Sequence, residues 1–568
     1  MTVLTPTDAD ARSTRARPRV TFRTVTARRV TGIALIVVPL GWALLRATHD
    51  GDIVNRGGLA LIDDLLASAL HPNFTPEFLA VVADATVITL AFAALGTAGA
   101  LVIGVLGGLV LSDVAWSSRP SAPVRLLRLA LRGILIALRS IHELIWALLL
   151  VSVLGLDPLA AVLAIAIPFG AQTAKIFAET LDGVPSGALR TLRSAGSRPI
   201  ASWAYGLLPQ AAPLLLSYSF YRFECAIRST VILGVVGVGG LGQEFAVSLQ
   251  SRNWDEVWTL VGAVVLLSAA ADLWSTRLRG DLAVVTCSDW SGGQRRASTG
   301  RSSWARWSVA IAVPGLVLAW FASGVSLSGM TSERTRNLTF RLLDDMLPPA
   351  LPPGGWAALT GAVLDTVAMA LLAMAVAVVL TVLIGPWASR LPRGPMDEQS
   401  GPLRGAARSA AWWIARFLLL VLRSVPPTVW AVIALFTLFP GILPGALALG
   451  LYTGGILGRL VAEAWEAIDT RPRDALRAIG TPRWLAGLAA TAPASAHHLV
   501  SYTLYRFEIC VRDTAIVGVV GAAGLGRLLA EDLAAFRFPA VTTLLIAFVA
   551  VTIASEIASR RLRRALRG

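Results

Sequence analysis

Tyr221-Arg222-Phe223-Glu224, followed by Arg228, Thr230 and the glycine-rich run 234–242, is a stretch that the chain carries twice. The second copy lies 284 residues further on and reads Tyr505-Arg506-Phe507-Glu508, then Arg512, Thr514 and the glycine-rich run 518–526. The same shift, without a gap, pairs Leu138-Arg139-Ser140 with Leu422-Arg423-Ser424. A repeat of this size predicts two homologous halves that face each other across a pseudo-twofold axis, with the Arg/Glu stretch near that axis.

The composition indicates a membrane protein. Hydrophobic residues make up 55% of the 568 residues and charged residues only 15%, and the mean hydropathy is +0.67. Apolar runs long enough to span a bilayer recur along the chain. A net charge of +15 could indicate nucleic-acid binding, but the arginines lie mainly in short segments between apolar runs, as the positive-inside rule requires. We therefore expect an all-α polytopic membrane protein that contacts lipid and not nucleic acid.

The apolar runs predict twelve transmembrane helices, six in each half, with both termini in the cytoplasm. In half one (30–279) the expected spans are near 30–47, 79–111, 129–154, 159–177, 205–224 and 257–273. In half two (307–568) they are near 307–325, 356–384, 413–438, 442–461, 484–505 and 541–557. An arginine-rich arm (1–29) comes first, and a basic tail ends half two. The segment 280–306, rich in Ser, Gly and Arg, is typical of a flexible cytoplasmic linker.

The cysteines and glycines point to packing and not to a metal or nucleotide site. Cys225, Cys287 and Cys510 make neither a disulfide framework nor a metal-ligand spacing. The run 237–242 lacks a following Lys-Ser/Thr and a preceding soluble strand, which excludes a P-loop or Rossmann interpretation. We expect the glycines to permit close helix packing or an irregular turn that lines a cavity. These structural positions are Gly237, Gly240, Gly242, Gly521, Gly524 and Gly526.

Each half has a mixed polar segment that predicts a short cytoplasmic helix. Half two contains Asp474-Ala475-Leu476-Arg477-Ala478-Ile479-Gly480, followed by Pro493, and half one matches with Thr191-Leu192-Arg193-Ser194-Ala195-Gly196 and Pro209. Half one departs from the pattern at Arg190, where an acidic residue is expected. The segments resemble the loop by which permeases of ABC importers engage their ATPases, a short amphipathic helix that docks in a groove of its partner. An ordinary cytoplasmic helical turn would also fit this pattern.

That resemblance implies two copies of a cytoplasmic ATPase as partners. The ATPase would bind ATP and magnesium, and this chain would bind no cofactor and would not be an enzyme. The implied coupling residues are Arg190, Leu192, Arg193 and Gly196 in half one, and Asp474, Ala475, Leu476 and Gly480 in half two.

Two further stretches narrow the resemblance. The run 138–147, Leu-Arg-Ser-Ile-His-Glu-Leu-Ile-Trp-Ala, resembles the Arg-Ser-x-Pro-Glu-x-x-Trp-Ala signature of phosphonate-type ABC permeases, the PhnE family, and the Tyr-Arg-Phe-Glu stretch resembles their second signature. His142 stands where that family has Pro, half two has Pro426-Pro427 and lacks the Glu, and Ala226 and Cys510 replace an Asn. The resemblance implies two permease units of the type I ABC importer fold fused in one chain. They would import phosphate, phosphonate or a related oxyanion across a bacterial plasma membrane, supplied by an external binding protein.

The residue chemistry agrees with an anionic cargo. Ionisable side chains inside a bilayer are costly and usually face a bundle interior or a water-filled path, and guanidinium groups suit phosphate oxygens. The candidate pathway and gate residues are Arg222, Glu224, Arg228, Thr230, Arg506, Glu508, Arg512 and Thr514. Glu224 and Arg228, like Glu508 and Arg512, are four residues apart and would share a helix face. They could instead be structural ion pairs, or pairs that open for a passing anion.

Other classes of protein fit part of the sequence. An ion-coupled secondary transporter of a small anion would also have a duplicated bundle with buried charge, but it would not need the cytoplasmic Ala-x-x-x-x-Gly loop. A scaffold or anchoring subunit would explain the spans without the paired charges, and an ABC permease for another small solute would explain both. The sequence leaves phosphate, phosphonate and phosphite undistinguished.

Overall fold

The computed structural model describes residues 37–49, 53–114, 121–286, 303–390 and 402–567, and these residues form helices with no strand beyond one isolated bridge. Half one contains the N-terminal helix (Val37–Thr48), α2 (Leu59–Ser68), α3 (Pro76–Leu111), α4 (Ala122–Ser140), α5 (Glu143–Leu154), α6 (Pro158–Gly183), α7 (Gly187–Ser194), α8 (Pro199–Gly206), α9 (Leu208–Leu233), α10 (Leu241–Gln250) and α11 (Trp254–Thr286). Half two contains α12 (Ser303–Ser323), α13 (Ser328–Thr331), α14 (Glu333–Asp345), α15 (Gly355–Ala388), α16 (Pro402–Ser424), α17 (Pro427–Thr437), α18 (Ile442–Glu466), α19 (Arg471–Ala478), α20 (Arg483–Ala486), α21 (Ala492–Val519), α22 (Leu525–Ala534) and α23 (Phe538–Arg567).

Nine of the twelve expected spans coincide with segments that are long and apolar enough to cross a membrane. Seven of these are single helices, α3, α6, α11, α15, α16, α18 and α23, and two are bent pairs, α4 with α5 and α9 with α10. The other three expected spans coincide with the N-terminal helix, α12 and α21, which are not in that set. The N-terminal helix is described only from Val37 onward.

Three predicted spans, 129–154, 413–438 and 484–505, are wrong in detail. The segment 129–154 is not one helix, because α4 and α5 meet at a bend of 92°. His142 lies at this bend in an extended conformation, and its ring accepts a hydrogen bond from the Leu144 N–H, which starts a new helix. In half two, Pro426 separates α16 from α17 at the equivalent point. The expected span 484–505 also starts too early, since α20 and a π-helical turn (Gly487–Thr491) precede α21.

The two halves share one plan with two different offsets. From the ends of α4 (Ser140) and α16 (Ser424) onward, equivalent residues are 284 positions apart, so that α10 (Leu241–Gln250) corresponds to α22 (Leu525–Ala534). The Thr89 hydroxyl of α3 accepts the Leu241 N–H at 2.9 Å, and the Thr366 hydroxyl of α15 accepts the Leu525 N–H at 2.9 Å. These two threonines are 277 positions apart, so half two is seven residues longer between its first long helix and the motif region.

The glycine-rich runs form tight turns that join α9 to α10 and α21 to α22. Gly240 and Gly524 have φ values of 80° and 96°, a region that L side chains rarely adopt, and Gly237 and Gly521 are also at positive φ. A Cβ on Gly242 would lie 1.9 Å from the Val231 carbonyl oxygen, and one on Gly526 would lie 2.9 Å from the Ala515 Cα. The expected irregular turn and close packing are confirmed. The turns are not among the residues that line the cavity described below, so close helix packing is the alternative that the structure favours.

The first helix of each half packs on the other half. Arg46 of the N-terminal helix donates to the Asp365 carboxylate of α15 at 2.7 Å and to the Gly361 carbonyl at 3.1 Å, and Ala43 is buried in the core of half two. Conversely, α12 packs against α3, and Val325, just after α12, is buried in the core of half one. The two halves are therefore interlocked through exchanged helices.

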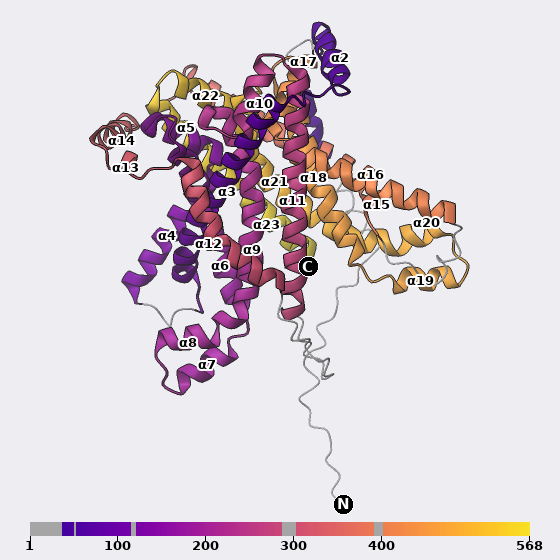
Figure 1. Cartoon of the computed structure of the whole chain (residues 1–568). Helices are drawn as coiled ribbons and strands as arrows, with labels where there is room; N and C mark the ends of the chain where they lie inside the picture. Colours follow the sequence, from indigo (N-terminus) through magenta and orange to yellow (C-terminus); the bar gives the residue numbers. More distant parts are fainter. Residues whose placement is uncertain (1–36, 50–52, 115–120, 287–302, 391–401, 568) are drawn as a thin grey trace, which may run out of the picture.

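The short helices α7 and α8, and likewise α19 and α20, project from the bundle at two separate places (Figure 1). In the view of Figure 1 the helices α2, α13 and α14 lie toward the upper end of the molecule, and α7 and α8 lie at the lower end. The helix α11 continues to Thr286 and α12 begins at Ser303, so both ends of the expected linker 280–306 are helical. The expected arm 1–29 and Cys287 lie outside the described residues, and Cys225 and Cys510 are free thiols.

Candidate functional site

A cavity of about 1470 Å³ lies between the two halves, and both halves contribute to its lining. The lining includes five of the residues that the sequence predicts for the pathway: Arg222, Glu224, Arg228, Arg506 and Arg512. Glu508, Thr230 and Thr514 are buried but do not line the cavity. The two threonine hydroxyls instead donate to carbonyls of their own helices, at 2.8 and 2.7 Å.

Arg222 of α9 and Arg506 of α21 occupy equivalent positions in the two halves. Their exposed fractions are 5% and 7%, although both line the cavity. The guanidinium of Arg222 lies 3.7 Å from the centre of the Phe169 ring and donates to the Gln172 side chain at 3.3 Å. In the described part of the chain, Nε of both arginines and Nη2 of Arg506 have no hydrogen-bond partner. Buried cationic donors without acceptors are costly, and they favour binding of an anion.

Arg228 and Arg512 also occupy equivalent positions, but their partners differ. Arg228 forms an ion pair with Glu224 at 3.0 Å, as the sequence predicts. The alternative of a structural ion pair does not apply to Arg512 and Glu508, since no hydrogen bond or ion pair between them is present among the described residues. Arg512 instead donates to the Arg139 carbonyl of the other half at 2.8 Å. This carbonyl is at the C-terminal end of α4, where helix carbonyls lack intrahelical donors.

A polar cluster beside Arg506 contains residues that the sequence did not place in the site. Ser229 donates to Glu143 at 2.6 Å, and Asp513 lies 3.8 Å from Nη2 of Arg506. His142 Nδ1 accepts the Leu144 N–H at 3.1 Å, so the ring proton is on Nε2. That Nε2 lies 3.3 Å from Glu143 and 3.7 Å from Asp513. His142 and Glu143 belong to the motif 138–147, and the 284-residue shift aligns Asp513 with Ser229. Neither the motif nor the repeat indicated that these residues would lie close together.

Two ion clusters connect the halves, a buried one around Glu556 and a half-buried one around Asp272, and neither was predicted from the sequence. Glu556 of α23 accepts two hydrogen bonds from Arg139, at 3.0 and 2.8 Å, and also pairs with Lys175 at 3.3 Å and with Arg560. Asp272 of α11 accepts from Arg423 at 2.9 Å and from Arg459. The corresponding members are each 284 positions apart: Asp272 and Glu556, Arg139 and Arg423, Lys175 and Arg459. The repeat could have revealed these clusters, because the two residues at each pair of equivalent positions carry the same sign of charge within an apolar stretch.

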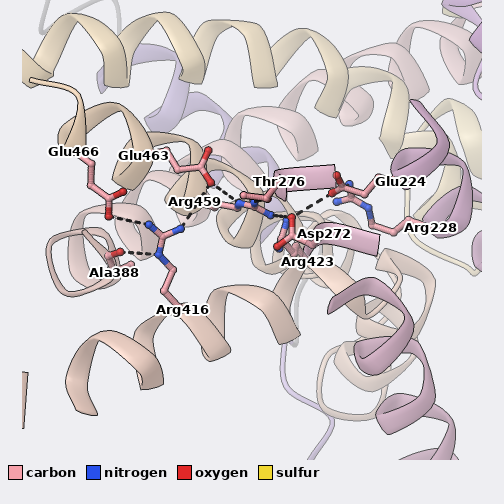
Figure 2. A network of polar contacts seen from close by, with 10 residues as sticks. All are labelled: Glu224, Arg228, Asp272, Thr276, Ala388, Arg416, Arg423, Arg459, Glu463 and Glu466. Atoms are coloured by element: carbon pink, nitrogen blue, oxygen red, sulfur yellow. Dashed lines mark hydrogen bonds and ion pairs between the residues drawn. The ribbon is translucent and has the colours of Figure 1, made fainter. Parts of the chain in front are cut away.

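A chain of polar contacts extends from the Asp272 cluster in two directions (Figure 2). Toward the cavity, Arg423 lies 3.9 Å from Glu224. Toward the end of α18, Arg459 binds Glu463 at 2.7 Å, Arg416 lies 3.7 Å from Glu463, and Arg416 binds Glu466 at 2.9 Å. The contacts therefore connect the cavity with the part of half two that leads into α19.

The two expected coupling helices have the local structure that the sequence predicts. Residues Arg190, Leu192 and Arg193 lie on α7, and Asp474, Ala475 and Leu476 lie on α19. Gly196 and Gly480 follow these helices with φ values of 79° and 88°, and each donates its N–H to a carbonyl of the last turn. Arg190 is exposed, whereas Asp474 forms an ion pair with the neighbouring Arg473 at 3.0 Å. Large apolar side chains nearby are exposed, namely Ile200, Tyr205 and Ile479.

A duplicated bundle of apolar helices around a charged cavity between its halves is the architecture of a membrane permease. The chain belongs to the family of binding-protein-dependent transport system inner membrane components, whose family model matches residues 102–282 and 406–568. Both halves are therefore permease units, fused in one multi-pass membrane chain that is the translocation subunit of an ABC importer. Such subunits work with a substrate-binding protein and with a separate ATPase, so the chain is not itself the enzyme. Family membership sets aside the secondary-transporter and scaffold alternatives.

Similar proteins are found among permeases. The phosphate-import permease protein PhnE of Mycolicibacterium smegmatis is 27% identical over 478 residues, which cover 84% of each chain. The phosphite transport system permease protein PtxC of Stutzerimonas stutzeri is 32% identical over 224 residues, 39% of this chain and 78% of the relative. Among solved structures, the inward-facing MetNI methionine ABC transporter matches with 21% identity and a TM-score of 0.32, covering 37% of this chain and 96% of the other.

Proposed function

We propose that this permease moves phosphate, phosphonate or phosphite into the cytoplasm through the cavity between its halves. The observation that carries the proposal is the pair Arg222 and Arg506, which are buried, line the cavity and have Nε–H groups without a partner in the described part of the chain. Guanidinium groups bind phosphate oxygens through charge-assisted hydrogen bonds. Two relatives bear the names of a phosphate-import permease and a phosphite transport permease, which agrees with an oxyanion as cargo.

Transport requires that the anion be held weakly enough to leave. At an effective dielectric constant of about 20, unit charges ~4 Å apart interact by roughly 4 kcal/mol, so several arginines without competitors would retain the anion. Glu224 binds Arg228 at 3.0 Å and would compete with the anion for it. Arg512 has no carboxylate partner among the described residues and donates to a backbone carbonyl. The two arginines would therefore act unequally, Arg228 as a gate and Arg512 as a fixed positive charge.

The proposed partners are two copies of a cytoplasmic ATPase and one external binding protein for the oxyanion. The ATPase copies would dock on α7 and α19, which project from the bundle (Figure 1), and would hold ATP and magnesium. The exposed apolar side chains beside these helices, Ile200, Tyr205 and Ile479, support a docking surface. The basic segments near α7 and α19 would be cytoplasmic, as would both termini, in accordance with the positive-inside rule.

The test is phosphate uptake by proteoliposomes that contain the full chain, its ATPase and its binding protein. Replacing both cavity arginines, Arg222→Gln with Arg506→Gln, should lower uptake by at least about tenfold, because the anion loses its buried donors. The ATPase should still co-purify with the variant. The matched control is Arg336→Gln on α14, whose side chain is 63% exposed, and it should transport normally.

Normal phosphate uptake by the double arginine variant would contradict the proposed pathway. Uptake that persists without the ATPase and follows an imposed ion gradient would support an ion-coupled carrier instead. Uptake of an unrelated small solute in preference to oxyanions would leave the chain an importer permease but remove the proposed cargo.

A further inference from the structure

The cavity is not symmetric, because several equivalent positions of the two halves differ in chemistry. His142 and Glu143 of half one correspond to Pro426 and Pro427, and Ser229 corresponds to Asp513. Two identical permease units would place every such group twice around the axis. The fused chain instead has one set of these polar groups, and Asp513 among them lies close to Arg506.

Asp513 is a buried carboxylate that faces the cavity with unused acceptor capacity. Its exposed fraction is 7%, and it lines the cavity. Two basic groups lie near it, Nε2 of His142 at 3.7 Å and Nη2 of Arg506 at 3.8 Å, and both distances are longer than hydrogen bonds. No described residue donates a hydrogen bond to the Asp513 carboxylate. A buried carboxylate without donors is costly, and it favours a ligand that carries one.

Arg506, beside Asp513, offers the complementary groups. Its Nε and Nη2 are buried and have no acceptor among the described residues. Glu143, the other nearby carboxylate, already accepts from Ser229 at 2.6 Å and lies closer to His142, at 3.3 Å. At this point of the cavity, Asp513 therefore remains available to a ligand as a hydrogen-bond acceptor, and Arg506 remains available as a donor.

We propose that Arg506 and Asp513 form a single binding station, without a counterpart in the other half, that selects a protonated oxyanion. A P–OH group of the ligand would donate to the Asp513 carboxylate, while an unprotonated P–O oxygen would accept from Nε and Nη2 of Arg506. This inference rests on the proposed function and specifies its cargo as an oxyanion that carries a proton at neutral pH. Sulfate carries none, so its oxygens would face the carboxylate without a hydrogen bond, and a site built for a hydroxyl rejects the analogue that lacks it.

The experiment measures binding of inorganic phosphate to the purified full chain in detergent, by the ³¹P line width of phosphate, with sulfate as competitor. The wild-type protein should bind phosphate, and at least about tenfold more sulfate than phosphate should be needed to displace it. Asp513→Asn should lower this preference to near one, because the amide can donate to sulfate as well as accept from phosphate. Asp513→Glu retains the carboxylate and should retain part of the preference.

The matched control is Glu531→Gln on α22, which removes an exposed carboxylate outside the cavity and should leave the preference unchanged.

Equal displacement by sulfate in the wild-type protein, or an unchanged preference in Asp513→Asn, would overturn the station. If phosphate binds, depends on Arg222 and Arg506, and is displaced equally by sulfate, the station fails while the proposed function stands. If phosphate does not bind at all, both fail. Equal displacement in the wild-type protein overturns the station by itself, and that outcome does not depend on any variant folding correctly.

Discussion

Glu556 is a buried carboxylate and Asp272 a half-buried one at the equivalent position, and each accepts hydrogen bonds from basic side chains of the opposite half. A buried ion pair adds little net stability over apolar packing, because desolvation opposes the attraction. Removing only one member is a different matter, since it leaves a charge buried without a partner. These two residues should therefore tolerate single replacement less well than the many exposed charges of the chain.

Glu556→Gln should destabilise the protein by about 3–5 kcal/mol, because Arg139 and Lys175 lose their buried counter-charge. The measurement is the temperature at which half of the purified protein remains monodisperse after heating. Glu333→Gln is the control, since its pair with Arg336 has side chains that are 79% and 63% exposed, and such pairs contribute at most about 1 kcal/mol. Adding Arg139→Gln to Glu556→Gln should recover part of the loss. Equal temperatures for the two single variants would contradict the buried pairing.

At the scale of elements, the glycine turns fix the entry into α10 and α22. Leu241 and Leu525 donate their N–H groups to threonines of α3 and α15, which secures the first turn of each short helix against a long one. The backbone reaches these threonines only because Gly240 and Gly524 adopt positive φ and have no side chain.

Gly240→Ala and Gly524→Ala should each destabilise the protein by about 1–3 kcal/mol through backbone strain. The new Cβ would also lie 2.7 Å from the hydroxyl oxygen of Thr89 or Thr366. Gly262→Ala in α11 is the control, because no heavy atom lies within 4 Å of the position that its Cβ would occupy and alanine favours a helix. Thermal stability of the three purified variants is compared, and a glycine-turn variant as stable as Gly262→Ala would show that the strain is absent.

The coupling helices differ in charge at one equivalent position, Arg190 in α7 and Asp474 in α19. If both dock on copies of one ATPase, the two docks cannot be equal. Asp474→Arg should lower ATP-dependent uptake on the order of tenfold, because a like charge would meet a surface that accepts an acidic residue. Arg190→Asp, which restores the acidic pattern in half one, should have little effect. Unchanged uptake and unchanged ATPase co-purification for Asp474→Arg would count against this docking.

In the whole molecule, the two permease units of the chain are interlocked. The N-terminal helix packs on α15, α12 packs on α3, and the two ion clusters cross between the halves. The polar contacts of Figure 2 add a connection from the cavity to the end of α18. The two permease units are therefore held together by contacts that do not depend on the covalent connection between them.

Expression of 1–290 and 291–568 as two separate chains should yield a complex that co-purifies through a tag on either piece. The exchanged helices and the ion clusters between the halves supply the association of the two pieces. Phosphate uptake should be retained within about twofold, because these contacts should hold the pieces together without the effective concentration that a covalent linker provides. Combining Glu556→Gln with Asp272→Asn in the split protein should sharply reduce recovery. Recovery of the two pieces as independent monomers would contradict the interlocked arrangement.

The features that depend on a local pattern or on the repeat could be predicted from the amino-acid sequence. The apolar runs predicted a helical membrane protein, the 284-residue shift predicted two equivalent halves, and Gly196 and Gly480 predicted the ends of the coupling helices. Each of these signals is contained in a short window or in a comparison of two windows. Five of the eight predicted pathway residues line the cavity for the same reason, because buried charge within an apolar helix has to face a polar interior.

The contacts between charged groups became known only from the folded structure. Arg139 pairs with Glu556, Arg512 turns to a carbonyl of the other half, and Asp513 lies between His142 and Arg506, all across large sequence separations. The exchange of the first helices and the change of offset from 284 to 277 have no local signature either. The physical reason is that equivalent sequences predict equivalent helices, whereas partner choice depends on how whole helices pack and which group each one brings within a few ångströms.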